Sequence, residues 1–246
     1  EDNFTSYQVE GTDLIKGDGI YDAANELKHD VKVFGITGSG EKVRLPGKAF
    51  TVVSTPYLTT TSADSTKVFV TQDAEDDLYD VAGTNTLATS YTVIISKTGE
   101  AIKRDVKVTD AKRVVTKLGF EDRESVAGNA LTSTEFEITS TTVTGEDLLK
   151  QLMADAEVTI ADQFGFDEGD DIELVVTSSG AAVTFGGKDQ ANVAITLSDI
   201  SNEDVKVTNN GRSDNLSVTG LEDNDSFVLT LTVNGVSQSV LVHVVK

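Results

Sequence analysis

The sequence predicts an all-β protein made of two tandem β-sandwich domains. Short segments in which apolar and polar residues alternate recur along the whole chain, for example at 31–34, 67–70, 92–95, 172–176 and 228–233. Turn-forming sequences such as Asn209-Asn210-Gly211 and Asn234-Gly235 separate these segments. Period-two alternation divided by such turns is typical of sandwiches and barrels. The 246 residues suffice for two domains of about 100–150 residues each.

The composition indicates cores built from aliphatic side chains and without covalent braces. The chain has no Trp, only 5 Tyr and 10 Phe, so Val, Ile and Leu must supply most of the core volume. These residue types suit a pleated, half-buried surface. The chain also has no Cys, which excludes disulfides, zinc–thiolate sites and thiol nucleophiles.

An internal repeat gives the domain count a second basis. Residues 90–108 align without a gap on residues 226–244, with aromatic on aromatic at Tyr91 and Phe227. The turn glycines Gly99 and Gly235 coincide in this alignment, and glycine supplies the positive φ that a tight hairpin turn requires. The same closing hairpin used twice predicts domains at 1–112 and 113–246.

One or two short helices are expected among the strands. Thr144 can cap a helix near 145–154, with Glu146 and Asp147 in its first turn and leucines on one face. The segment from Asn25 to His29 is a shorter candidate in the first half.

The charge balance excludes some partners and favours others. With 20 basic and 41 acidic residues the net charge is −21, which makes nucleic acid and anionic lipid poor partners. No apolar run reaches the length of about 18 residues that a membrane span needs, so no membrane insertion is expected. Hard divalent cations and basic surfaces are the favoured partners. Alternatively, the excess carboxylate only keeps the protein soluble.

Three acidic loops are candidate calcium sites. The residues that we expect as ligands are Asp76, Asp77, Asp167, Asp170, Asp171, Asp223 and Asp225. Like charges packed so closely destabilise a loop unless water, protons or a cation offset them, and calcium accepts 6–8 oxygens in flexible geometry. None of the loops has EF-hand spacing, and a solvated acidic loop is the alternative at each one.

Nothing in the sequence predicts catalysis. The two histidines, His29 and His243, lie in unrelated places, and His243 alternates with valines as a sheet-surface residue does. No serine occupies a Gly-x-Ser-x-Gly elbow. Paired carboxylates can hydrolyse glycosidic bonds, but a chain without Trp lacks the usual sugar platform. We therefore expect no enzyme.

The closing segments 228–236 and 240–244, together with the opening 114–118, resemble bacterial immunoglobulin-like modules that occur in tandem on surface proteins. The bias to Thr, Val, Asp and Lys without Cys or Trp is similar to that of the surface-layer (S-layer) proteins of Bacillus-type bacteria. This resemblance implies an extracellular cell-wall location, self-association into a two-dimensional lattice, and calcium as a stabiliser.

Other roles and partners stay open at the level of sequence. The chain begins at Glu1 without Met, so we expect a piece of a longer protein whose other domains, with lattice neighbours, are its partners. No S-layer homology motif is present to anchor it. The alternatives are an adhesin or stalk module that binds a protein or glycan, and an accessory domain of a secreted enzyme.

Overall fold

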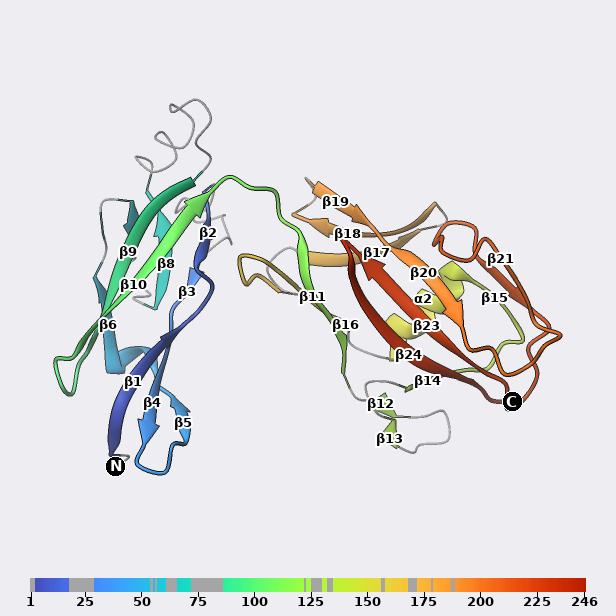
Figure 1. Ribbon diagram of the computed structural model, residues 1–246, viewed down its shortest axis with the longest axis horizontal. Helices are drawn as coiled ribbons and strands as arrows, with labels where there is room; N and C mark the ends of the chain where they lie inside the picture. Colours follow the sequence, from blue (N-terminus) through green and yellow to red (C-terminus); the bar gives the residue numbers. More distant parts are fainter. Residues whose placement is uncertain are drawn as a thin grey trace. The chain divides into compact units, whose positions relative to one another are not determined.

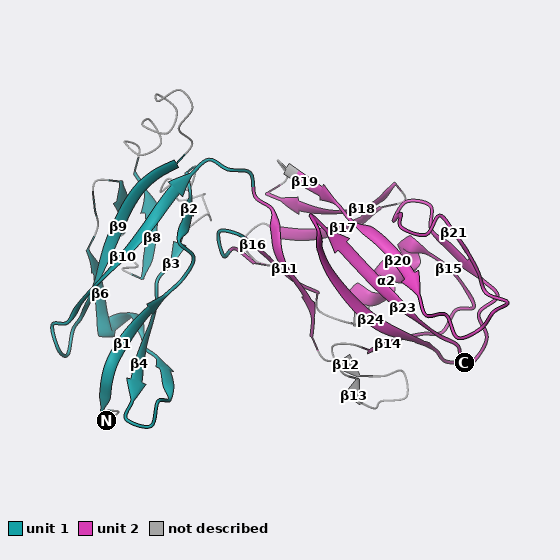
Figure 2. Cartoon of the chain, viewed as in Figure 1, with its two compact units in different colours: residues 1–112, 163–165 teal, residues 113–162, 166–246 magenta. Residues whose placement is uncertain are grey.

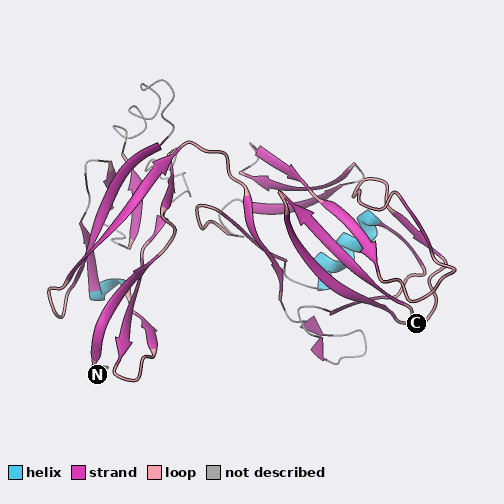
Figure 3. Ribbon diagram, in the orientation of Figure 1, coloured by secondary structure: helices cyan, strands magenta, loops and turns pink. Residues whose placement is uncertain are grey.

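The computed structural model describes residues 3–17, 29–53, 55, 57–60, 66–71, 86–121, 123–124, 130–131, 135–155, 158–167, 172–177, 179–186 and 189–246. They divide into two compact units, residues 1–112 with 163–165 and residues 113–162 with 166–246 (Figure 2). Strands dominate both units, and both are all-β sandwiches (Figure 3). The predicted all-β sandwich fold is therefore confirmed, whereas the predicted domain boundaries, 1–112 and 113–246, stay a prediction.

Unit 1 contains a four-stranded sheet and two smaller ones. The four-stranded sheet has the order β2-β10-β9-β6, in which β2 runs parallel to β10 and the other neighbours are antiparallel. The smaller sheets have the orders β1-β4-β5 and β3-β8-β7 (Figure 1). The strands are β1 (Phe4–Glu10), β2 (Leu14–Lys16), β3 (His29–Asp30), β4 (Lys32–Thr37), β5 (Lys42–Arg44), β6 (Phe50–Val53), β7 (Leu58–Thr59), β8 (Lys67–Val70), β9 (Thr86–Ile95) and β10 (Ala101–Thr109), with a 3-10 turn η1 (Gly47–Ala49) before β6.

The core of unit 1 forms from alternate residues of these strands. Tyr91, Val93 and Ile95 on β9 are buried, whereas the residues between them are partly exposed. They pack in one cluster with Val33 of β4 and Val68 of β8, so all three sheets contribute to a single core. This period-two burial is what the alternating sequence predicted.

Unit 2 is built on a second four-stranded sheet, β14-β24-β23-β20, accompanied by smaller sheets. These smaller sheets are β11-β16, β12-β13, β15-β22-β21 and β17-β18-β19. The strands are β11 (Val115–Phe120), β12 (Arg123–Glu124), β13 (Ala130–Leu131), β14 (Glu135–Ile138), β15 (Thr142–Thr144), β16 (Val158–Asp162), β17 (Ile172–Thr177), β18 (Gly180–Phe185), β19 (Asp189–Asn192), β20 (Ala194–Ser198), β21 (Lys206–Thr208), β22 (Ser217–Thr219), β23 (Ser226–Val233) and β24 (Val236–Val244).

The predicted helix is α2 (Gly145–Asp155). Thr144 and Asp147 form a reciprocal capping box, because the Thr144 hydroxyl accepts the Asp147 backbone N–H and the Asp147 carboxylate accepts the Thr144 backbone N–H. Leu148, Leu149 and Leu152 are fully buried, so the helix attaches to the unit through one apolar face. The predicted cap and the predicted apolar face are both confirmed.

The second predicted helix is wrong at its one described residue. His29 lies in strand β3 and pairs with Val68, whereas Asn25 to Lys28 lie outside the described residues. Helix-forming residue types around His29 gave the local signal, but pairing with a distant strand decides its conformation.

The repeated hairpin is confirmed, with one difference that the alignment did not predict. In unit 2 the loop is Asn234-Gly235, with φ of 52° and 82°, and Val233 pairs with Val236. In unit 1 the loop is longer, and the pairing starts from Ile94 with Ala101. The register therefore differs by two residues, which leaves every side chain on its original face.

The repeat also extends beyond the hairpin. In both units the last strand has a short parallel neighbour, β2 in unit 1 and β14 in unit 2. In both units the other hairpin strand has an antiparallel neighbour, β6 or β20. The same four-strand arrangement is thus present twice, with an inner face that is buried and an outer face that is open.

Candidate functional site

The best-described acidic loop is a turn that is locked by its own hydrogen bonds. In residues 222–225, Asp225 Oδ2 accepts the backbone N–H of Glu222 at 2.6 Å and the Asn202 side-chain amide at 3.0 Å. Asp223 Oδ1 accepts the backbone N–H of Lys246 at 2.9 Å. The intervening Asn224 has φ of 69°, a conformation that Asn tolerates better than most residues. These carboxylates stabilise the entry to β23 and its junction with the end of β24.

The remaining predicted calcium ligands are not brought together within the described residues. Asp167 is exposed beside β16, where it forms an isolated bridge with Ala161. Asp76, Asp77, Asp170 and Asp171 lie outside the described residues. No group of three or more His, Asp or Glu side chains that could hold a metal occurs in the part of the chain that the structure describes. Calcium binding at the predicted residues stays a prediction.

The two histidines occupy opposite kinds of environment. His29 is buried against Tyr91, with ring centroids 6.1 Å apart, and burial lowers its pKa to about 4. Burial also raises the pKa of Tyr91 to about 12. His243 lies on the outer face of β24, 3.8 Å from the Glu135 carboxylate, as expected for a sheet-surface residue.

The His29 and Tyr91 pair lies beside a cationic side chain that ties three segments together. Arg104 on β10 donates to the carbonyls of Val9 and Gly11 and to the carboxylate of Asp13. Nε2 of His29 and the Tyr91 hydroxyl are buried, and the described protein atoms offer neither of them a hydrogen-bond partner. Because an unpaired buried polar group is costly, a neutral imidazole is favoured over a charged one here.

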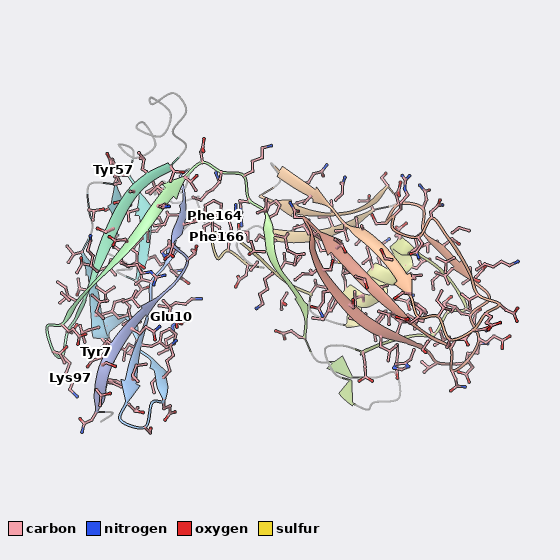
Figure 4. The ribbon with its side chains drawn as sticks, viewed as in Figure 1. Tyr7, Glu10, Tyr57, Lys97, Phe164 and Phe166 are labelled. Carbon is pink, nitrogen blue, oxygen red and sulfur yellow. The ribbon has the colours of Figure 1, made fainter. Side chains whose placement is uncertain are left out.

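A buried ion pair in unit 2 was not predicted. Arg113 Nε donates to Asp162 Oδ2 at 2.5 Å, and the two residues are only 8% and 4% exposed. Asp162 Oδ1 also accepts the backbone N–H of Phe166, which is labelled in Figure 4. The guanidinium of Arg113 lies 4.9 Å from the Phe166 ring centroid and 5.4 Å from that of Phe185. This cluster fixes the start of unit 2 and has the properties of a structural brace.

The outer face of β23 and β24 in unit 2 carries two cross-strand pairs of hydroxyl side chains. The Thr230 and Ser239 hydroxyls are 2.8 Å apart across β23 and β24, and those of Thr232 and Ser237 are 2.7 Å apart. One hydroxyl of each pair donates to the other, so only the second O–H of the pair needs a partner from solvent.

β20 is an edge strand of the four-stranded sheet in unit 2, and part of its free edge is covered. Asn210 pairs its side-chain amide with the N–H and the carbonyl of Leu197 on β20, at 2.7 and 2.8 Å. A side chain that occupies these backbone groups prevents another strand from pairing at this position.

The outer face of the unit 1 sheet carries a shallow hollow of about 460 Å³. Its lining includes Asp13, Ser90, Lys103, Asp105 and Lys107, and none of its lining residues is aromatic. The rim of the hollow therefore carries both signs of charge, whereas most of its lining surface is apolar.

The surface of the described residues offers no aromatic platform. The large hydrophobic residues that are exposed there are Val53, Val114 and Met153, which come from separate segments and include no aromatic side chain. Within that same part of the chain, no helix combines the length and the apolar character of a membrane span.

Comparisons with known proteins return solved structures only. No family model matches the sequence, and no curated protein does. Domains 4 and 5 of the S-layer protein SbsC are similar over 99% of each chain, at 12% identity and a TM-score of 0.26. Domains 6–7 of SbsC match over 98% of each chain at 15% identity and a TM-score of 0.29. Human protocadherin-24 EC1-2 matches over 99% of each chain at 10% identity and a TM-score of 0.28. S-layer protein domains, the resemblance stated from the sequence, are thus among the similar solved structures.

Proposed function

We propose that this chain is a structural building block of a bacterial surface layer, located outside the cell, where it associates with copies of itself in a two-dimensional lattice. It catalyses no reaction in this proposal. The observation that carries the proposal is the chemistry of its surface. The described exposed residues are mainly Thr, Ser, Asp and Lys, and the three exposed large hydrophobics are scattered. Such a surface suits broad packing contacts better than capture of a small ligand.

The repeated sheet supports the same proposal. Each unit has the same arrangement of four strands, with partly or fully exposed side chains on the outer face of its hairpin. Assembly proteins are built from rigid units whose repeated faces meet repeated partners. The covered β20 edge in unit 2 indicates that sheet faces and loop tips, not this strand edge, would make the contacts.

Calcium is the second part of the proposal. A net charge of −21 opposes close packing of copies, because like charges repel across each contact. Calcium bridges between carboxylates would offset this repulsion within and between molecules. Asp167 and Asp223 are exposed acids that face solvent in the described residues. Asp76, Asp77, Asp170 and Asp171 belong to the other predicted loops.

Sedimentation velocity over a concentration series, with calcium or with chelator, tests the proposal. We expect large species above a threshold concentration in calcium, and smaller species in chelator. Magnesium at equal ionic strength is the control that separates calcium binding from screening. A monomer at every concentration, with a melting temperature that millimolar calcium does not change, would contradict both parts.

A recognition module is the second candidate, and the hollow beside Asp13 and Lys103, with its charged rim, favours it. In that case a glycan or protein ligand would bind the hollow. A ligand screen in which Lys103→Ala and Lys107→Ala abolish binding to the monomer would support this role in place of assembly.

A further inference from the structure

The outer faces of the two equivalent sheets differ in charge. In unit 1, Val106 and Val108 of β10 point into the core, so the exposed Lys103, Asp105 and Lys107 lie on the outer face. Lys16 lies on the same face, because its neighbour Ile15 on β2 is buried. This face therefore carries three lysines and one aspartate on β2 and β10. Lys103 pairs with Asp105 at 2.8 Å, and the Lys16 Nζ donates to the carbonyl of Asp110.

The equivalent face of unit 2 carries the opposite charge. On β14, Phe136 and Ile138 are buried, so Glu135 and Glu137 lie on the outer face. The outward positions of β20, β23 and β24 hold no Lys, Arg, Asp or Glu. The described outer face of this sheet thus has two glutamates and no lysine or arginine.

The charge totals of the two halves agree with this difference. Residues 1–112 contain 12 basic and 18 acidic residues, a net charge of −6. Residues 113–246 contain 8 basic and 23 acidic residues, a net charge of −15. The lysine-bearing face thus lies in the less acidic half of the chain, and the glutamate-bearing face lies in the more acidic half.

The neutral parts of both faces allow close approach. In unit 2 the hydroxyl pairs, such as Thr230 with Ser239, carry no charge, and one hydroxyl of each pair already donates to the other. In unit 1 the strands beyond β10 present Thr92 and Ile94 on β9 and, next to β9, Val53 on β6, which is 46% exposed. In both sheets the charged residues lie toward the strand that runs parallel to the last strand.

We propose that the lysine face of unit 1, on β2-β10-β9-β6, binds the glutamate face of unit 2, on β14-β24-β23-β20, of a second copy. Contacts between like faces place lysines against lysines or glutamates against glutamates, and like charges that face each other repel across a closed interface. A contact between the lysine face and the glutamate face is therefore favoured. Such a contact is heterologous, because it joins two different surfaces of the molecule. A heterologous contact does not close on itself in a dimer, so it propagates in one direction through an array. This inference rests on the proposed self-association and names the surfaces that carry it.

Charge reversal with rescue tests the contact in the full chain. Lys103→Glu with Lys107→Glu should raise the concentration at which assembly begins by at least about tenfold, as should Glu135→Lys with Glu137→Lys. Mixing the two reversed proteins should restore assembly, because each supplies the unlike face that the other has lost. The matched control is Lys48→Glu with Lys97→Glu, which makes the same charge change outside the face. Lys97 lies at the tip of the β9–β10 hairpin (Figure 4).

The outcomes separate this inference from the proposed function. If the unmodified chain assembles and both face reversals leave assembly unchanged, the contact is wrong and the proposed function stands. If the control reversal weakens assembly as much as the face reversals, net charge explains the effect and the contact is also wrong. If the unmodified chain assembles under no condition, the proposed function fails and the contact fails with it. Circular dichroism melts show that each variant is folded.

Discussion

The buried side chain of Arg113 donates a hydrogen bond to the buried carboxylate of Asp162, which lies 49 residues further along the chain. Asp162 ends β16 and Arg113 precedes β11, so the pair joins the two strands of one small sheet. A buried pair of this kind adds little when compared with an apolar pair, but loss of one partner leaves an uncompensated charge.

Removal of one partner should therefore destabilise unit 2 strongly. We expect Arg113→Met or Asp162→Leu to lower the free energy of unfolding by about 3–5 kcal/mol. The double variant Arg113→Met with Asp162→Leu should recover much of that loss, because no buried charge remains. Urea unfolding of all three proteins measures these values.

The exposed ion pair between Arg212 and Asp214 is the control for this prediction. Its hydrogen bond raises the pKa of Arg212 and lowers that of Asp214, but Arg212 is exposed and Asp214 partly exposed, so solvent screens the pair. Asp214→Asn should leave the melting temperature almost unchanged. Equal losses at the buried and the exposed pair would show that burial does not set the effect.

The buried His29 should make the stability of unit 1 dependent on pH. Its pKa is lowered from 6.5 to about 4, mainly by burial, with Arg104 and Lys32 adding to the effect and Asp30 and Asp13 opposing it. Above pH 6.5 the imidazole is neutral in the folded and unfolded chains, and its contribution to stability is complete. Between pH 6.5 and 4 only the unfolded chain binds the proton, so stability falls by about 3 kcal/mol and then levels off.

Two measurements check this pH dependence. The variant His29→Leu should lose the part of the decline that the histidine causes, so the difference between its unfolding curves and those of the unmodified chain isolates the effect. In an NMR titration, the His29 ring should stay in its neutral form down to about pH 4. A titration midpoint near 6.5 in the folded protein would refute the assignment.

The Asn234-Gly235 turn should be sensitive to the backbone and insensitive to side-chain volume. Gly235 has φ of 82°, and a Cβ atom there would meet nothing within 4 Å. Gly235→Ala should therefore cost about 1 kcal/mol through the left-handed conformation alone. Gly38→Ala is the matched control, because Gly38 lies in a turn without positive φ and has space for a Cβ. Similar melting temperatures for the two variants would contradict this explanation.

The acidic turn at 222–225 should be a structural element. Asp225→Ala removes the acceptor for the Glu222 N–H and for the Asn202 amide, and should cost about 1–3 kcal/mol. Glu203→Ala, an exposed acid in a neighbouring loop, should have little effect. If the loss appears only in calcium and disappears in chelator, Asp225 acts as a metal ligand and its hydrogen bonds are secondary.

The sequence predicted what depends on local pattern. Alternating burial on β9 and β23, the helix cap at Thr144 and the positive φ at Gly99 and Gly235 all follow from residues close together in the chain. The two-residue shift between the hairpins was not predictable, because a shift of two keeps the same faces and leaves the pattern unchanged.

What the sequence could not predict depends on distant partners. Arg113 stands next to Lys112 in a polar segment that looks exposed, and its partner Asp162 gives no signal in that segment. The short strands β2 and β14 become visible only through parallel pairing with β10 and β24. Acid spacing in the 222–225 loop did not indicate that backbone N–H groups occupy the oxygens of Asp223 and Asp225.

Electron microscopy of the protein with calcium and with chelator tests the central claim most directly. The proposed function predicts ordered two-dimensional arrays with a single repeat in calcium, and their dispersal in chelator. Isolated particles in both conditions, at concentrations where the protein remains folded, would contradict a lattice-forming role.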